Sequence, residues 1–166
     1  MFEINSEPLF GISDNKRTRM RAEYLGFIFQ DFNLLPVLSA VENVELPLLL
    51  LGNSASEARK GALEALQSVG LSQRSEHLPS ELSGGQQQRV AVARALVHNP
   101  TVILCDEPTG NLDSVTSAEV LELLHKLNRE RNTTFLIVTH DAMIAKRCTR
   151  TLQKSDGTIV EDRRNE

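Results

Sequence analysis

The stretch LSGGQQQRVAVARAL, residues Leu82 to Leu96, places a serine and two glycines directly ahead of an amphipathic run. Ser83 and Gln86 have the spacing of a capping box, which marks the N-terminus of a helix. The glycines let backbone N–H groups approach an oxyanion without interference from a Cβ atom, and the unpaired amides and helix dipole supply positive potential. The stretch predicts a phosphate site, with an ordinary capped helix as the alternative.

Two apolar segments after this helix end in polar side chains that suit phosphate chemistry. Residues 101–105 are typical of a buried strand, which Asp106 and Glu107 follow. Because Mg²⁺ bound to nucleotide phosphates takes few protein carboxylates, Asp106 suits a metal ligand, and Glu107 suits a general base. A solvated loop start is the alternative. Residues 134–139 predict another strand, which brings His140 to the same edge, where it can contact a terminal phosphate or order the attacking water.

A third apolar run, Tyr24 to Phe29, also predicts a buried strand, and Gln30 follows it. The amide of Gln30 can touch both a metal and a water molecule, as neutral positioning groups do in phosphoryl transfer. Apolar residues at helical spacing predict a helix over residues 115–131, between the other two strands. This strand–helix–strand order indicates a parallel sheet, and ligands bind at the carboxyl ends of parallel strands.

The remaining segments are expected to form connections and a terminal hairpin. A loop is expected around Pro36 and Pro47, followed by a helix that begins at Ser54 and stops at Gly70. Asp156-Gly157 between short apolar runs favours a hairpin over residues 150–160. The last six residues are polar, and we expect them to be frayed.

Composition limits the class of protein. The chain has 166 residues with 40% hydrophobic content, which is enough for a single domain over residues 1–166. The net charge is −4 and the 18 Lys and Arg residues are scattered, which argues against a nucleic-acid partner. No apolar run approaches the roughly 20 residues that a spanning helix needs. Cys105 and Cys148 lack metal-site spacing and favour a reduced, cytoplasmic chain.

The motifs together resemble, in order and spacing, the nucleotide-binding domain of ABC transporters. The resemblance extends from Phe2 to Val160 and rests on Phe29-Gln30, Leu82-Ser83-Gly84-Gly85-Gln86, Asp106-Glu107-Pro108-Thr109-Gly110-Asn111-Leu112-Asp113 and Thr139-His140-Asp141. It implies an α/β fold, the RecA-like P-loop NTPase core of an ABC ATPase, with a parallel sheet and a helical subdomain over residues 33–94. The segments 29–36, 41–47 and 110–113 look most like the lipoprotein-releasing and macrolide-export subgroup.

The resemblance also implies cofactors, partners and a role for each motif. ATP and Mg²⁺ would be the cofactors, and the partners would be a second ABC ATPase subunit in a head-to-tail dimer and an integral membrane permease. The chain would then be cytoplasmic and peripheral on the inner membrane. The implied roles are Gln30 as the Q-loop glutamine and metal contact, Ser83, Gly84, Gly85 and Gln86 as the signature, Asp106 as the Walker B metal ligand, Glu107 as the catalytic glutamate, Asp113 as the D-loop aspartate and His140 as the switch histidine.

The sequence departs from this family in one respect, because no lysine follows any glycine and the GxxxxGK[ST] P-loop is absent. The resemblance places Met1 after the P-loop helix and suggests an N-terminal truncation. The P-loop amides and lysine make most of the contacts to the β and γ phosphates. In P-loop ATPases related to this family the P-loop strand lies in the middle of the sheet, so we expect residues 134–139 to expose an unpaired edge and an apolar flank. We therefore expect the isolated chain to be poorly stable and to bind ATP weakly or not at all.

Three functions are compatible with these residues. The first is the ATPase subunit of a transporter, which exports a substrate or releases lipoproteins. The second is a non-catalytic partner that lends only its signature, residues 83–86, to an intact ATPase. The third is a non-transport ABC ATPase of DNA repair or translation, which the lack of a basic patch, a coiled-coil insertion and a second cassette argues against.

Overall fold

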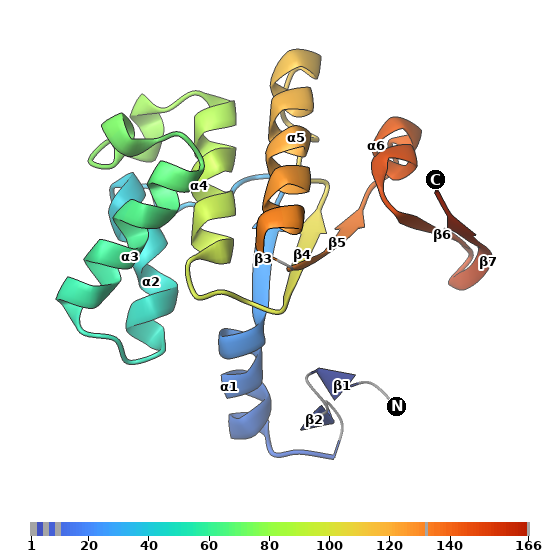
Figure 1. Ribbon diagram of the computed structural model, residues 1–166, viewed down its shortest axis with the longest axis horizontal. Coiled ribbons are helices and arrows are strands. Elements are labelled where there is room, and N and C mark those ends of the chain that lie inside the picture. Colours follow the sequence, from blue (N-terminus) through green and yellow to red (C-terminus); the bar gives the residue numbers. More distant parts are fainter. Residues whose placement is uncertain (1–2, 5–6, 9–10, 132, 166) are drawn as a thin grey trace.

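The computed structural model describes residues 3–4, 7–8, 11–131 and 133–165. At its centre is a three-stranded parallel sheet with the order β3-β4-β5, seen in Figure 1, formed by β3 (Leu25–Phe29), β4 (Val102–Asp106) and β5 (Thr134–Val138). Phe29 pairs with Asp106, and Asp106 pairs with Val138. The carboxyl ends of all three strands are therefore level, and the predicted parallel sheet is confirmed.

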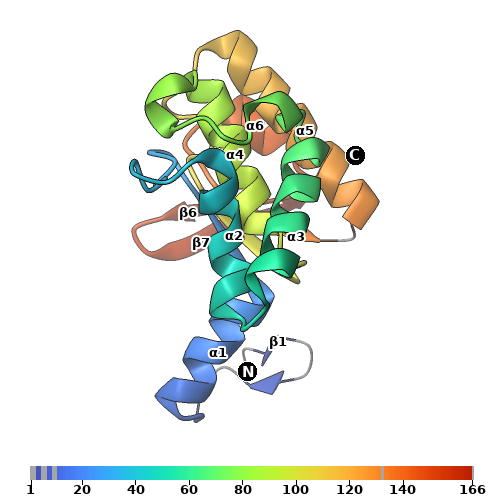
Figure 2. The ribbon, with the colours of Figure 1, turned by 90° about the vertical axis from the view of Figure 1, so that its left-hand side faces the viewer.

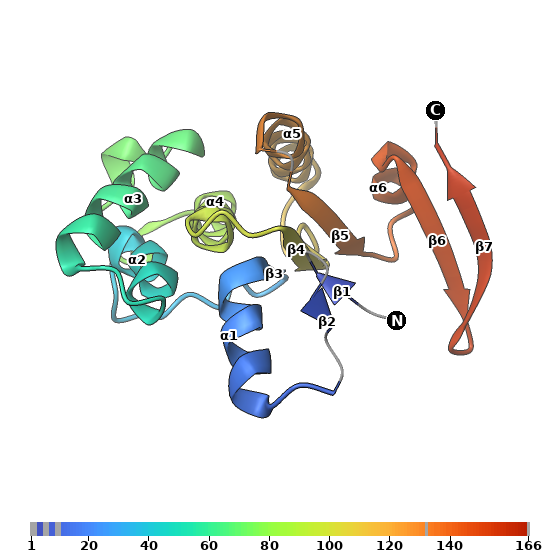
Figure 3. The same cartoon turned by 60° about the horizontal axis from the view of Figure 1, so that its bottom comes forward.

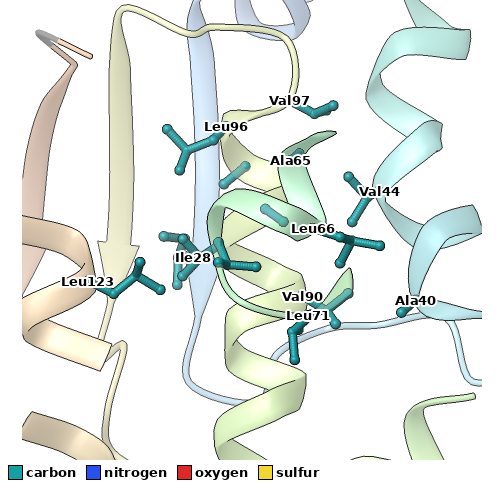
Figure 4. Close-up of a cluster of buried hydrophobic side chains, with 14 of the residues drawn as sticks. Ile28, Ala40, Val44, Ala65, Leu66, Leu71, Val90, Leu96, Val97 and Leu123 are labelled. Atoms are coloured by element: carbon teal, nitrogen blue, oxygen red, sulfur yellow. The ribbon is translucent and has the colours of Figure 1, made fainter. Parts of the chain in front are cut away.

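Two helices lie along one side of this sheet. α4 (Gly84–Leu96) packs on β3, and α5 (Ser114–Arg131) lies beside α4 on the same side, as Figure 3 shows. Alternate strand residues face these helices and join their apolar side chains in one cluster, part of which is drawn in Figure 4: Ile28, Val90, Val92, Leu96, Ile103, Leu123, Leu124 and Leu127. Both predicted helices are confirmed, each within two residues of its expected ends.

α2 (Ala40–Leu50) and α3 (Ala55–Ser68) form a second layer that packs on α4, in front of it in Figure 2. Short 3₁₀ turns at Ser72–Arg74 and Pro79–Glu81 connect this layer to α4. None of the described helices is both long and apolar enough to cross a bilayer.

The loop expected around Pro36 and Pro47 was wrong, because α2 contains Pro47. Ser39 and Glu42 form a capping box: the Ser39 N–H donates to Glu42 Oε2 over 2.7 Å, and the Glu42 N–H donates to Ser39 Oγ over 3.4 Å. Val41 and Val44 are fully buried on one face of the helix. Capping and burial together outweigh the cost of an interior proline, which is about 3 kcal/mol.

The N-terminal part contains elements that the sequence pattern did not predict. β1 (Glu3–Ile4) pairs antiparallel with β2 (Glu7–Pro8), and α1 (Asp14–Tyr24) follows. Ser13 caps α1, because its hydroxyl accepts the Lys16 N–H. Tyr24 therefore ends a helix, and the strand predicted to start there begins one residue later.

The predicted terminal hairpin is confirmed. After α6 (Ala142–Arg147), β6 (Arg150–Ser155) pairs with β7 (Thr158–Arg164). Asp156 and Gly157 both have positive φ, 48° and 84°, as a two-residue hairpin turn requires. The expected fraying from residue 161 was wrong for residues 161–164, because β7 continues and the Arg150 guanidinium donates twice to the Asp162 carboxylate, over 2.9 and 2.6 Å.

Among the residues that the structure describes, the second face of the sheet and its β5 edge carry exposed apolar side chains. Among the described strands β5 ends the sheet, and Leu136 and Val138 are 52% and 60% exposed. Leu136 lies in register with Leu104 and Phe27, and Phe27 is 37% exposed. Parallel sheets are normally covered on both faces. The exposed edge and apolar flank expected from the sequence are thus confirmed.

Candidate functional site

The predicted polar residues follow the carboxyl ends of three neighbouring strands. Gln30 follows β3, Asp106 ends β4 with Glu107 next to it, and His140 lies just beyond β5. Because these strand ends are in register, the structure brings the residues to one edge of the sheet. An edge of this kind is where ligands bind in open parallel sheets.

The Glu107 carboxylate and His140 are in direct contact. His140 Nδ1 lies 2.6 Å from Glu107 Oε1, and the His140 backbone N–H donates to the same oxygen over 3.0 Å. The Thr139 hydroxyl donates to the other oxygen, Oε2, over 3.2 Å. Glu107 has a positive φ of 46°, and its own N–H donates to Val138 O, so the turn after β4 is tied to the end of β5. These bonds fix a carboxylate and an imidazole side by side.

The environment of Glu107 favours its ionised form. Partial burial acts to raise the pKa of Glu107, but the side-chain and backbone hydrogen bonds from His140, the charge of His140 and the Thr139 hydroxyl together lower the pKa below the usual 4.5. At neutral pH the Glu107 side chain is therefore a carboxylate that can accept a proton.

The contact between Glu107 and His140 is expected to depend on pH in a defined direction. Because the pKa of Glu107 is lower in the folded than in the unfolded chain, the stabilisation it gives is present above pH 4.5 and is lost as the pH falls through the folded-state pKa. An NMR titration of the Glu107 carboxyl carbon measures that pKa. His140→Ala removes one donor and is expected to raise the midpoint; a wild-type midpoint at or above 4.5 contradicts the prediction.

Gln30 is exposed, and its amide is held by a residue that the sequence analysis did not single out. Gln30 Nε2 donates to Asn111 Oδ1 over 3.0 Å. Asn111 Nδ2 donates to the backbone carbonyl of Gln30 over 3.2 Å and to Asp31 Oδ1 over 2.7 Å. Asn111 lies 81 residues further along the chain, so only a long-range contact identifies it.

The signature begins α4 as predicted. Gln86 N–H donates to Ser83 Oγ over 3.3 Å, and Ser83 N–H donates to Gln86 Oε1 over 3.0 Å, which completes the capping box. Ser83 is exposed and Gly85 is buried. A Cβ atom on Gly85 would lie 2.3 Å from Thr116 Cγ2. The second glycine therefore leaves the space that the Thr116 methyl group occupies where the first turn of α4 meets α5, a packing role that the sequence did not predict.

Replacing Gly85 with alanine is expected to lower the free energy of unfolding by about 1–2 kcal/mol, because the new methyl group overlaps Thr116. Thr116→Ser removes the overlapping methyl and is expected to restore most of this loss in the double variant. Gly84→Ala is the matched control, since its Cβ would lie 3.3 Å from Leu112 Cδ2. Urea unfolding of the variants decides between these outcomes, and equal stability of Gly85→Ala and Gly84→Ala would contradict the packing role.

Asp113 directly precedes α5, and its carboxylate is engaged in that helix start. Oδ1 accepts the N–H groups of Val115 and Thr116, each over 3.0 Å, and Oδ2 accepts the Thr116 hydroxyl. The side-chain bond from Thr116, followed by the backbone bonds, lowers the pKa of Asp113. In this structure Asp113 caps a helix, and a contact to a cofactor stays a prediction.

Asp106 is exposed at the end of β4, beside the fully buried Cys105. Burial, with a smaller contribution from Cys148, raises the pKa of the Cys105 thiol to about 12. Within the described ranges no group of three or more His, Cys, Asp or Glu side chains is arranged to hold a metal ion. Mg²⁺ that arrives with nucleotide phosphates needs only one or two protein carboxylates, so Asp106 with the Gln30 amide fits such an ion.

Gln88 is a second residue that the sequence analysis did not single out. It is fully buried, and its Nε2 donates to the carbonyls of Pro108 and Phe29, the neighbours of Glu107 and Gln30. It therefore ties the signature helix to both strand ends. Its position four residues before Val92, on the buried face of α4, is the pattern that could have identified it.

Comparisons with known proteins agree with this geometry. The family model described as ABC transporter matches residues 3–110. The ABC transporter ATP-binding protein YbbA of Escherichia coli K12, itself described as uncharacterized, is 49% identical over 156 residues, which cover 94% of this chain and 68% of YbbA. The ABC transporter ATP-binding protein YtrE of Bacillus subtilis 168 gives the same identity and coverage.

Solved structures match as well. The ATP-binding cassette MJ0796, described as a dimer in a post-hydrolysis state bound to ADP and Pi, superposes with a TM-score of 0.84 at 43% identity, covering 98% of this chain and 72% of that chain. A second dimeric structure of MJ0796, described as a bacterial ABC transporter cassette, gives a TM-score of 0.81 at 45% identity over 93% of this chain and 68% of that chain.

The fold and the strand-end site define a nucleotide-binding α/β protein with the P-loop NTPase fold. Within that class, the chain belongs to the ABC transporter ATP-binding proteins. Members of this family bind and hydrolyse ATP, dimerise and work with membrane permease subunits.

Proposed function

We propose that this chain contributes to ATP hydrolysis at a subunit interface and that the hydrolysis drives a membrane permease. The observation that carries the proposal is the contact between Glu107 and His140, over 2.6 Å, at the sheet edge that also presents Gln30 and Asp106. It joins a group able to take a proton from water to a group able to contact a phosphate.

The roles of the side chains follow from their chemistry. Glu107 is ionised and accepts the proton of the attacking water, while Thr139 and the backbone of His140 keep its carboxylate in place. The His140 ring donates toward the terminal phosphate. Asp106 and the Gln30 amide would hold Mg²⁺, which neutralises charge on the phosphates during transfer.

The signature acts on a nucleotide held by the other subunit of a head-to-tail dimer. Ser83 is exposed at the N-terminus of α4, where the helix dipole and free amides attract phosphate. The 166 residues contain no glycine-lysine P-loop, so the amides and lysine that contact the other phosphates are not among them. This chain would therefore supply the residues that act on the attacking water, and the signature that faces the nucleotide of the other subunit.

The resemblance of residues 29–36, 41–47 and 110–113 to the lipoprotein-releasing and macrolide-export subgroup supports export or lipoprotein release as the transport reaction. A permease subunit would hold the chain at the cytoplasmic face of the membrane. The lack of a glycine-lysine pair favours one alternative, in which the chain is a non-catalytic partner and contributes only Ser83 to Gln86.

A mixing experiment tests the interface. The chain is added to an intact ABC cassette whose own signature serine has been replaced, so that the cassette binds ATP but lacks the opposing half of its site. The wild-type chain and the control Ser72→Arg, which alters another exposed serine, are expected to restore hydrolysis, and Ser83→Arg is not. Restoration by Ser83→Arg, or none by the wild-type chain, would count against the proposal.

A further inference from the structure

The side chains of Asp31, Asn111 and Gln30 form a directed chain of hydrogen bonds beside the strand-end site. Asp31 Oδ1 accepts from Asn111 Nδ2 over 2.7 Å, and Asn111 Oδ1 accepts from Gln30 Nε2 over 3.0 Å. Asn111 Nδ2 also donates to the Gln30 backbone carbonyl over 3.2 Å. All three residues are exposed, so they are not part of the hydrophobic core.

The chemistry of the Asp31 carboxylate, the first acceptor, determines the direction of each hydrogen bond in this series. The Asp31 carboxylate and the Gln30 backbone carbonyl can only accept, so both require the NH₂ end of the Asn111 amide. The oxygen of Asn111 must then face Gln30, where only the NH₂ end of the Gln30 amide can bond to it. The Gln30 oxygen is consequently left on the side away from Asn111.

Close packing against Gly110 restricts the same amide independently. A Cβ atom at position 110 would lie 2.8 Å from Gln30 Nε2 and 2.9 Å from its Cδ. The Gln30 side chain therefore lies directly over the Gly110 backbone, in space that any other residue would fill. Packing sets the place of the amide, and the hydrogen bonds set which end is oxygen.

We propose that Asn111, oriented by Asp31, is a positioning residue that turns the oxygen of the Gln30 amide toward the metal and water side of the site. Oxygen is the ligand atom that Mg²⁺ requires, and an NH₂ group in its place would repel the ion. This inference rests on the proposed function for the identity of the ion, whereas the orientation of Gln30 rests on the hydrogen bonds alone.

Side-chain amide NMR of the ¹⁵N-labelled chain tests the orientation without any nucleotide. Gln30→Glu removes one pair of NH₂ signals and so assigns it. Asn111→Ala is expected to move the Gln30 NH₂ signals toward those of a free amide, because its acceptor is lost. Asp31→Asn is expected to move them part of the way, because Asn111 is then held by the Gln30 backbone carbonyl and no longer by a carboxylate.

The double variant Asp31→Asn, Asn111→Asp reverses the bond between residues 31 and 111, loses the bond to the Gln30 backbone carbonyl and keeps the bond to Gln30 Nε2. Asn at 31 donates to Asp at 111, whose carboxylate can only accept from Gln30, so the NH₂ signals of Gln30 are expected to return to a single bonded pair. Gln30 signals that do not move in Asn111→Ala, or that stay at the position of a free amide in the double variant, would overturn the inference. Backbone amide spectra of every variant verify that the fold is retained.

Hydrolysis by the transporter complex that contains this chain provides a second readout. Asn111→Ala is expected to raise the Mg²⁺ concentration for half-maximal activity about threefold to tenfold, as the loss of one exposed charge-assisted bond implies, with kcat at saturating Mg²⁺ little changed. A fall in kcat alone would contradict the positioning role. Absence of any hydrolysis in the wild type would count against the proposed function and leave the NMR result to decide the orientation.

Discussion

Replacing Glu107 with glutamine is expected to lower kcat for ATP hydrolysis by the transporter complex about 10²- to 10⁴-fold, the usual contribution of a general base. The wild-type carboxylate accepts hydrogen bonds from Thr139 and from the backbone of His140, with the His140 ring 2.6 Å away, and these contacts keep it ionised. An amide of the same shape cannot take a proton from water. ATP binding should be preserved, because the change leaves the size of the side chain unaltered.

Single-turnover hydrolysis and equilibrium ATP binding, measured on the same preparation, separate these two effects. Glu122→Gln, on the exposed surface of α5, is the matched control and should leave both unchanged. An unchanged kcat in Glu107→Gln contradicts the role of Glu107 as base. Combined with a loss of activity in Ser83→Arg, that outcome would identify the chain as a partner that contributes its signature only.

Gly26→Ala is expected to lower the free energy of unfolding by about 3 kcal/mol, at the upper end of the cost of overpacking. A Cβ atom there would lie 2.4 Å from the backbone oxygen of Ala95 and 3.0 Å from Ile103 Cγ1. Because the obstacle is the backbone of α4, no change of side-chain rotamer relieves it. The only relief is to separate α4 from β3, which opens the core.

Gly61→Ala is the control for this substitution. Its Cβ would lie 2.9 Å from Leu48 Cδ1, the end of a flexible side chain, and in ordinary van der Waals contact with Val97 Cγ2 at 3.9 Å, and alanine is the better helix former. Urea unfolding should therefore show a large fall in midpoint for Gly26→Ala and a small change of either sign for Gly61→Ala. A Gly26→Ala midpoint equal to that of the wild type would show that β3 and α4 can move apart freely.

The parts of the fold that the sequence predicted are those with a strong local pattern. Continuous apolar runs marked the strands, and the spacing of Ser83 and Gln86 marked the start of α4. The sequence pattern did not predict α2 because Pro47 favours a loop, although Ser39 and Glu42 have the same capping spacing as Ser83 and Gln86 in α4. The proline and the capping spacing are both local signals, and the burial of the apolar face of α2 favours the helix over the loop.

The predicted site residues could be placed at one edge from topology alone, because parallel strands in register align their carboxyl ends. The partners of those residues could not. Asn111 contacts Gln30 across 81 positions, and Gln88 reaches Phe29 across 59. Contacts at such separations depend on how the helices and strands pack. The helical period places Gln88 on the buried face of α4 but does not indicate its partner, and Asn111 lies in no helix or strand. The close packing of Gly85 against Thr116 could not be predicted from the sequence for the same reason.

The buried thiol of Cys105 gives the site a reporter of its own. Alkylating reagents attack thiolates. The Cys105 thiol is protected because its pKa of about 12 keeps it protonated and because its side chain is buried. Modification must wait until β4 separates from its neighbours, so the alkylation rate measures how often the strand that ends in Asp106 opens. A ligand that binds only the closed form slows that rate in proportion to its occupancy. Alkylation of Cys105, followed separately from that of the less buried Cys148, thus reports the opening of the sheet without any substitution in the chain.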